Sequence, residues 1–212
     1  MATSAFLWNR LAKGYAKGPV GDPAAYQRKL EVTRTYFTPE SEVMEFGCGP
    51  GTTSVSHAPF VRRIRAYDIS EKMLEIARSR AAEAGVDNVT FERADIIDLD
   101  LPEASLDVVM GHSILHLLRP KARKAVLAKV LRLLKPGGVF VSSTVCIAEA
   151  KGALARILPP VVRSLPLMPP VQSLSLDELR REITGAGFTI VYDWKPDTQP
   201  VLFVVARKAG AA

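Results

Sequence analysis

A glycine-rich segment contains the residues whose types and spacing most directly suggest chemistry. It reads EFGCGPGT from Glu45 to Thr52 and follows a short apolar run that predicts a strand. Glycines at alternate positions let the backbone turn sharply, and they let a ligand lie against the main chain. Dinucleotide sites have the spacing G-x-G-x-x-G, whereas this segment has G-x-G-x-G with an acid two residues before the first glycine. The segment therefore predicts a site for a cationic ligand without phosphates.

Three further motifs follow this segment along the chain. They are YDIS at 67–70, ADIIDLDLPEASLDVV at 94–109 and LLKPGGVFV at 133–141. Together with EFGCGPG they resemble, in order and spacing, the motifs of the class I S-adenosylmethionine-dependent methyltransferases, and the likeness covers 43–206. The resemblance implies an enzyme whose cofactor is S-adenosylmethionine. It also implies a Rossmann-like α/β fold, with a seven-stranded mixed sheet in the order 3-2-1-4-5-7-6 and the seventh strand antiparallel.

The resemblance assigns the glycine-rich segment to the methionine end of the cofactor. Glu45 is expected to help hold the ammonium group, or else only to brace the glycine loop. Gly47 and Gly49 are expected to admit the methionine backbone. Cys48, which lies between them, is expected to be a small residue in a tight turn beside the cofactor rather than a nucleophile.

The resemblance assigns the nucleoside end of the cofactor to the next two motifs. Asp68 is expected to accept hydrogen bonds from the two ribose hydroxyls, and Ile69 to pack on the adenine face. Asp68 could instead cap the following helix, but Ser70 already fills that position. Asp95 is expected to accept from the adenine amino group beside the amide of Ile96, with a plain turn residue as the alternative for Asp95.

Two tyrosines near the N-terminus are further candidates for the cofactor pocket. The segment WNRLAKGY at 8–15 resembles the aromatic-x-x-x-A-x-x-Y segment of the ubiquinone/menaquinone-biosynthesis type of methyltransferase, in which aromatic residues help close the cofactor pocket. The resemblance implies this role for Tyr15, and similarly for Tyr26, with plain helix packing as the alternative. The segment departs from the family pattern at Asn9 and Ala16, where the family has aspartate.

Histidines after the fourth predicted strand are the candidate catalytic residues. His112 and His116 lie in the sequence GHSILH, on a loop that in this fold lies beside the transferred methyl group. Histidine is the usual base for an acceptor hydroxyl, because its pKa is close to neutral. Either residue could instead only line the acceptor pocket, since an activated sulfonium needs little beyond alignment and exclusion of water. His57 is expected on the surface.

The elements that must position these residues follow from hydrophobic periodicity. Short β-branched runs alternate with helical patterns, which predicts βαβ units and a parallel sheet. Strands are expected at 42–46, 63–68, 88–93, 106–110, 139–145, 188–194 and 201–206, and the main helices at 71–84, 120–134 and 177–186. Two more helices in a cap at 1–40 have no strand partners, so we expect them across the sheet's edge or over its carboxyl end. The methyltransferase domain is expected at 41–212.

An apolar segment broken by prolines follows the fifth predicted strand. It reads ALARILPPVVRSLPLMPPV at 153–171 and cannot form one straight helix. The resemblance implies that residues 150–175 form an acceptor lid. A broken helix packed on the domain and a membrane-touching patch are the alternatives.

Absent motifs narrow the expected reaction. The sequence has no Asn/Asp-Pro-Pro-Tyr/Phe after the fourth predicted strand, which argues against methylation of base amino groups. It also lacks the paired glutamates of arginine methylation and the acidic cluster with which catechol-type enzymes bind a divalent metal. We therefore expect metal-free transfer to a small organic acceptor that is apolar or aromatic.

Composition and charge limit the remaining classes. A chain of 212 residues suits one domain, or one domain with an added lid, and a net charge of +6 raises the question of a polyanionic partner. The basic residues are scattered, so nucleic acid is not favoured, although an RNA-directed or non-catalytic S-adenosylmethionine-binding protein stays as the alternative function. Two cysteines and an N-terminus without signal-peptide features indicate a cytoplasmic location. Membrane contact is not favoured, and the oligomeric state is left open.

Overall fold

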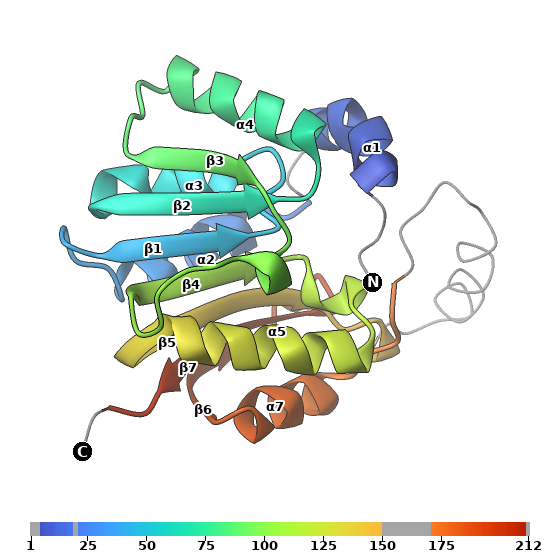
Figure 1. Cartoon of the computed structure of the whole chain (residues 1–212). Coiled ribbons are helices and arrows are strands. Elements are labelled where there is room, and N and C mark those ends of the chain that lie inside the picture. Colours follow the sequence, from blue (N-terminus) through green and yellow to red (C-terminus); the bar gives the residue numbers. More distant parts are fainter. Residues whose placement is uncertain (1–4, 19–20, 150–170, 211–212) are drawn as a thin grey trace.

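The computed structural model describes residues 5–18, 21–149 and 171–210, and it contains one seven-stranded sheet between layers of helices (Figure 1). The strands are β1 Glu42–Phe46, β2 Arg63–Asp68, β3 Val89–Arg93, β4 Leu106–His112, β5 Leu134–Val145, β6 Phe188–Trp194 and β7 Val201–Lys208. Their spatial order is β3-β2-β1-β4-β5-β7-β6. The first five strands run parallel, whereas β7 is antiparallel to both β5 and β6. The expected fold is confirmed.

The helices alternate with the strands along the chain. The helices are α1 Ala5–Lys17, α2 Pro23–Arg34, α3 Thr52–His57, α4 Glu71–Glu83, α5 Pro120–Leu133 and α7 Leu176–Gly185, and short 3-10 turns are η1 Ala58–Phe60, η2 Ile96–Asp98, η3 Leu115–Leu117 and η4 Ile147–Glu149. Ser70 caps α4 by accepting a hydrogen bond from the Met73 amide, as expected. No helix among the described ranges is both long enough and apolar enough to cross a membrane.

Each face of the sheet carries its own hydrophobic core. Helices α5 and α7 cover one face, where Leu127 and Leu179 pack with Phe140 of β5. On the other face, Leu74 of α4 packs with the strand residue Ile64. Burial on both faces explains why consecutive apolar residues occur in the central strands, as at 108–110 of β4, which is typical of a parallel sheet.

The two N-terminal helices take different positions. Helix α1 lies against the N-terminal end of α4, where the Asn9 side-chain oxygen accepts hydrogen bonds from Ser70 Oγ at 2.7 Å and from the Lys72 amide at 3.2 Å. Helix α2 lies behind the sheet in Figure 1, and its Val32 packs against the second core. Helix α2 thus packs on a face of the sheet, which the sequence did not predict. Tyr26 and Lys29 of the same helix also line a cavity at the carboxyl ends of the strands, so the expected position is correct only in part.

Four strand boundaries differ from the sequence expectation, those of β4 and β5 among them, and the boundary of β4 affects the site. Strand β5 begins at Leu134, which pairs with Leu106 before the register shifts, so the expected start at Val139 is too late. Strand β4 continues to His112, which pairs with Ser143 of β5. The expectation that His112 lies on a loop is wrong, and the strand ladder holds this residue in place.

The proposed lid falls largely outside the described residues, since these include only residues 171–175 of the expected 150–175. Within that part, the Gln172 amide donates to the His116 carbonyl at 2.8 Å, and the Leu174 carbonyl accepts from the Ala148 amide at 3.2 Å. The division into a cap at 1–40 and a domain at 41–212 stays a prediction.

Candidate active site

Two adjoining cavities open at the carboxyl ends of β1, β2 and β4. The larger has a volume of about 780 Å³ and the smaller about 110 Å³. Both are lined by the residues Tyr15, Gly47, Gly49, His112 and Ser113. In open α/β sheets, ligands bind in the crevice at the carboxyl ends of the strands. The shared wall means that one extended ligand can occupy the small cavity and continue into the large one.

The glycine loop, residues 47–51, lines this crevice with main-chain atoms at Gly47 and Gly49. The Cys48 amide donates to the Tyr67 carbonyl at 3.0 Å, and the Gly49 amide donates to Asp68 Oδ2 at 2.8 Å. Gly49 has φ +53°, and a Cβ built there would lie 4.0 Å from the nearest atom, on the Tyr15 ring. Hydrogen bonds to β2 therefore hold the loop in place, while the side of Gly49 that faces the cavity is open to a ligand.

Asp68 joins the glycine loop to the smaller cavity. Its carboxylate is only 8% exposed, and its Oδ1 accepts from the Ser70 amide at 2.8 Å. Burial raises the pKa of this carboxyl, and the hydrogen bonds from Ser70 and Gly49 act in the opposite direction. Each carboxylate oxygen has a second lone pair, so the two hydroxyls of a ribose can still be accepted.

The rest of the smaller cavity suits a flat apolar ring with a polar edge. Ile69 and Ile96 line it together with Asp95. Asp95 also caps η2, since its Oδ1 accepts from the Ile97 amide at 3.2 Å. The sequence alternatives for Asp95, turn residue and cavity residue, are thus both compatible with its position.

Glu45 lines the larger cavity, and its pKa is raised above the ordinary value of a glutamate. Its side chain is buried, and Ser54 Oγ donates a hydrogen bond to Oε2. Burial raises its pKa to about 7, with the neighbouring Asp68 adding to the increase and the Ser54 bond opposing it. A cation beside Glu45 would favour the charged carboxylate, which makes the residue suited to an ammonium group.

The pKa of Glu45 gives a prediction for the pH dependence of cofactor binding. Because a ligand ammonium needs ionised Glu45, the affinity for S-adenosylhomocysteine should fall as the pH decreases through about 7, by about tenfold between pH 8 and pH 6. Calorimetric titration at these two values measures the change. Glu45→Gln should bind more weakly than the wild type and lose most of the pH dependence; a variant that keeps the full dependence would exclude Glu45 as its source.

The two tyrosines and Cys48 line the larger cavity. Tyr15 is 54% exposed on the wall shared by both cavities, with Trp8 packed edge-on at 6.0 Å between ring centroids. The Tyr26 hydroxyl lies 3.4 Å from Thr53 Oγ1. Burial raises the pKa of the Cys48 thiol well above its ordinary value, which favours the thiol form and agrees with a packing role for Cys48 rather than a nucleophilic one.

The three histidines differ in their positions relative to the cavities. His112 lines both cavities, whereas His116, in η3, lines neither. His57 is fully buried against the Phe37 ring and lines the larger cavity, so the expectation of a surface position is wrong. Burial lowers the pKa of His57 to about 3 and the pKa values of His112 and His116 to about 4, so all three rings are neutral at physiological pH.

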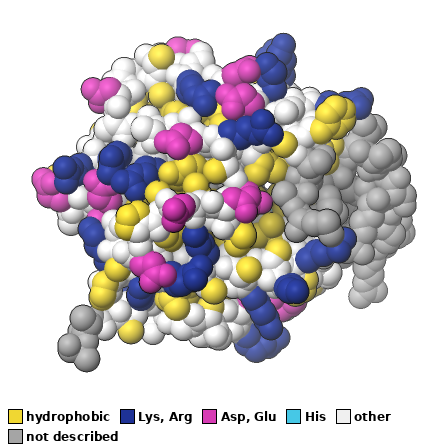
Figure 2. All heavy atoms as spheres, viewed as in Figure 1, with side chains coloured by type: hydrophobic (Ala, Val, Ile, Leu, Met, Phe, Trp, Pro, Cys, Tyr) yellow, Lys and Arg dark blue, Asp and Glu magenta, His cyan; other side chains and the backbone are white. Residues whose placement is uncertain are grey.

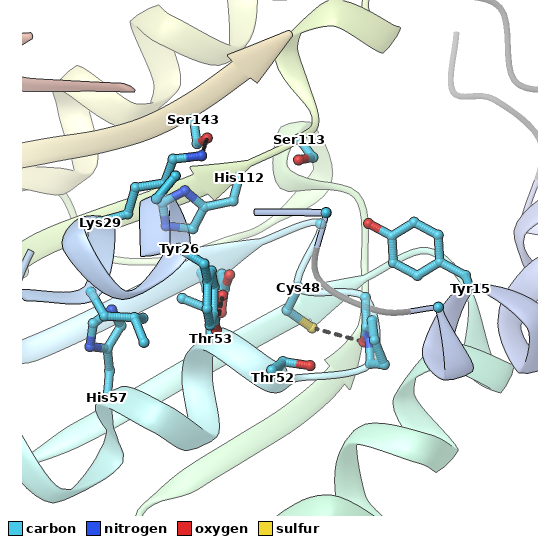
Figure 3. A pocket seen from close by; sticks show the side chains of 18 of the residues that line it. Tyr15, Tyr26, Lys29, Cys48, Thr52, Thr53, His57, His112, Ser113 and Ser143 are labelled. Carbon is cyan, nitrogen blue, oxygen red and sulfur yellow. Dashed lines mark hydrogen bonds between the residues drawn. The ribbon is translucent and has the colours of Figure 1, made fainter. Parts of the chain in front are cut away.

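Sequence reasoning missed a lysine in the larger cavity. Lys29 of α2 reaches over the sheet, and its Nζ donates to Ser143 Oγ at 2.9 Å (Figure 3). Nothing in the sequence marks Lys29, because a lysine on an amphipathic helix usually faces solvent. Lys29 reaches the cavity only because α2 lies on a face of the sheet, and periodicity alone did not predict that position.

The fold and the site together define a class of protein. The strand order, the antiparallel last strand, the glycine turn after β1 and the acid at the end of β2 are the features that the resemblance to the class I S-adenosylmethionine-dependent methyltransferases implies.

Comparisons with known proteins agree with this class. Residues 43–138 match the family described as methyltransferase domain. The chain is 35% identical over 101 residues to an uncharacterized methyltransferase, YcgJ, from Bacillus subtilis, an alignment that covers 48% of this chain and 39% of that protein. It is 32% identical over 143 residues to the demethylmenaquinone methyltransferase of Symbiobacterium thermophilum, covering 64% and 56% of the two chains. The structure of the [4+2]-cyclase SpnF superposes with a TM-score of 0.74 at 17% identity, covering 92% and 85%.

These matches assign residues 43–138 to a methyltransferase domain. The chain carries a domain of the S-adenosylmethionine-dependent methyltransferase family, and S-adenosylmethionine is the cofactor of that family. The chain spans about half the length of the curated relatives that it matches.

Proposed function

We propose that this chain is a cytoplasmic enzyme that transfers the methyl group of S-adenosylmethionine to a small apolar or aromatic organic acceptor, without a metal ion. The observation that carries the proposal is the pair of adjoining cavities. The smaller has the residue types that a nucleoside needs, and the larger, at about 780 Å³, has room for a methionine group and a further molecule.

The residues of the chain would hold the cofactor at three places. Asp68 would accept the ribose hydroxyls, Ile69 and Ile96 would enclose the adenine, and Glu45 would hold the ammonium group beside the open backbone of Gly49. Bound S-adenosylmethionine would supply a methyl group already activated on a sulfonium. The contribution of the protein is then mainly to align the acceptor and to exclude water.

The lining of the larger cavity supports an acceptor with apolar surface. Ala25 and Leu30 of α2 line it, together with the ring of Tyr26 and the neutral ring of His57. One relative is named as a demethylmenaquinone methyltransferase, which supports a small-molecule acceptor. His112, on the wall between the cavities, is the better placed of the two candidate catalytic residues, and His116 stays a candidate without a position at either cavity.

The alternative, an RNA-directed or non-catalytic protein, rests mainly on the net charge. The densest basic group, Arg62, Arg63 and Arg65, surrounds Glu42 within 4.0 Å, so part of its charge is neutralised. On the face shown in Figure 2, basic and acidic side chains are interspersed rather than segregated. The likeness to a cyclase shows that this fold also occurs in proteins named for other reactions, so the activity needs a direct test.

A methyl-transfer screen tests the proposal. The protein is incubated with radiolabelled S-adenosylmethionine and fractionated cell extract, with small-molecule, lipid and RNA pools assayed separately. Label should appear in the small-molecule or lipid pool, and Asp68→Ala should abolish it. Label in the RNA pool alone would favour the alternative, and no label in any pool would favour a non-catalytic protein.

Metal independence gives a second test of the proposal. Among the described residues, no group of three or more His, Cys, Asp or Glu side chains is arranged to hold a metal ion. We expect methyl transfer to keep at least about 80% of its rate after treatment with EDTA, since alignment rather than Lewis-acid catalysis would supply the rate enhancement. Loss of activity with EDTA that magnesium restores would refute this part of the proposal.

A further inference from the structure

A polar cluster lies beside the wall between the two cavities, and it consists of the half-buried Lys29 and His112 and the buried Ser143. We propose that this cluster binds an anionic oxygen of the acceptor, so that the enzyme selects apolar acceptors that carry a carboxylate or a phenolate. The inference deepens the proposed function and rests on it.

Three elements bring the cluster together. His112 at the end of β4 pairs with Ser143 of β5, and Lys29 Nζ lies 2.9 Å from Ser143 Oγ. Figure 3 shows the lysine side chain extending from α2 toward His112 and Ser143 inside the cavity. Because His112 lines both cavities, a group bound here would lie next to the junction where the cofactor and the acceptor must meet.

The ammonium group of Lys29 has more hydrogen-bond donors than the protein acceptor found for it uses. It has three N–H groups, and Ser143 Oγ is the acceptor found for one of them. No carboxylate of the described residues lies within 4.0 Å of it. Burial lowers the pKa of Lys29, with Asp22 opposing the change. A half-buried ammonium without a counterion is unfavourable, and an anionic ligand would relieve this cost.

The other charged groups of the larger cavity already have partners. Arg80 donates to the carbonyls of Pro50 and Ala16 and to Thr52 Oγ1. Glu45 accepts from Ser54 Oγ, and Asp22 accepts from the Ala25 amide and from Thr198 Oγ1. Lys29 is therefore the cation of this cavity that is best placed to receive a ligand.

His112 supplies a second donor. Its Nε2 is buried and has no hydrogen-bond partner among the described residues. Burial and the neighbouring Lys29 both lower its pKa, so the ring is neutral and carries one N–H. In the tautomer with hydrogen on Nε2, it could donate to an oxygen that also accepts from Lys29. A buried polar atom left without a partner is costly, which suggests that a ligand completes the site.

Lys29 is also set apart from the expected place of the methionine group. The glycine loop follows β1, whereas Lys29 Nζ is bound to Ser143 of β5. Strand β4 lies between β1 and β5 in the sheet. Neighbouring strands are about 4.8 Å apart, so the two places are separated by at least one strand spacing. The acceptor, rather than the cofactor, is therefore the expected partner of Lys29.

A series of probes with one aromatic skeleton tests the proposal. 2-Naphthoate, 2-naphthol and the neutral 2-naphthalenemethanol are titrated calorimetrically into the protein, with and without saturating S-adenosylhomocysteine. We expect the wild type to bind naphthoate, or naphthol as its anion, at least about tenfold more tightly than the neutral alcohol. Tight naphthoate binding would identify a carboxylate acceptor, and the absorption band of bound naphtholate would identify a phenolate acceptor.

Variants of Lys29 separate this role from a structural one. Lys29→Met should remove the preference for the anion, and Lys29→Arg should keep part of it. Lys124→Met, which removes an exposed lysine of α5, should leave the preference unchanged. All three variants should bind S-adenosylhomocysteine within about twofold of the wild type, because the cofactor is expected elsewhere.

Several results would overturn the proposal. They are equal binding of the neutral and anionic probes, no binding of any probe, a preference that persists in Lys29→Met, and a loss of S-adenosylhomocysteine affinity in that variant. The last result would assign Lys29 to the cofactor carboxylate. If the wild-type protein does not bind S-adenosylhomocysteine but still prefers the anionic probes, the proposed function is refuted. The proposal that Lys29 belongs to an anion-binding site is then still supported.

Discussion

Replacing Asp68 by alanine should weaken the binding of S-adenosylmethionine and S-adenosylhomocysteine by about 30- to 1000-fold. Removing the charged, buried acceptor of two ribose hydroxyls should cost about 2 to 4 kcal/mol in total, because hydrogen bonds to charged groups are stronger than those between neutral groups. The substitution also removes the acceptor of the Gly49 amide, at 2.8 Å, so the glycine loop loses its attachment to the end of β2.

Calorimetry with S-adenosylhomocysteine measures this effect. Asp68→Asn keeps the size of the side chain and one carbonyl oxygen, so its loss should be smaller than that of Asp68→Ala. Asp100→Ala serves as the control, because Asp100 is exposed and lines neither cavity. Unchanged affinity in Asp68→Ala would remove this residue from the cofactor site.

Replacing Gly51 by alanine should destabilise the fold by about 2 to 4 kcal/mol and lower the thermal midpoint by roughly 10 °C. Gly51 has φ +73°, and a Cβ built there would lie 2.7 Å from Ala77 Cβ and 2.9 Å from the Phe91 ring. Both neighbours are buried, so neither has free space to move into. The penalty has two parts, the left-handed backbone and the steric overlap.

A matched variant separates these two parts. Gly85, just after α4, has φ +65° but no atom within 4 Å of a Cβ built there. Gly85→Ala should therefore show only the backbone cost, about 1 to 2 kcal/mol. Thermal unfolding followed by circular dichroism compares the two variants. Equal losses would mean that close packing around Gly51 contributes nothing.

The sequence by itself determined the strands, the glycine turn and several residues of the smaller cavity, and the family resemblance supplied the order of the strands. These features depend on local patterns: alternating strands and helices, glycines where φ is positive, and a Ser70 cap directly after Asp68. Because parallel strands bring their carboxyl ends to one edge, Asp68 and Asp95 had to lie near the glycine loop once the strand order was correct.

The polar lining of the larger cavity was decided by the tertiary structure. The sequence could not show that α2 packs on a sheet face, and this packing both buries His57 under Phe37 and brings Lys29 to Ser143, more than a hundred residues further along the chain. It also could not show that β4 continues to His112, because the extra residues are held by pairing with β5 rather than by their own propensity. Local patterns specify which elements form, but contacts between distant elements decide which polar side chains lose contact with water, and here these contacts place Lys29 beside His112 in the larger cavity.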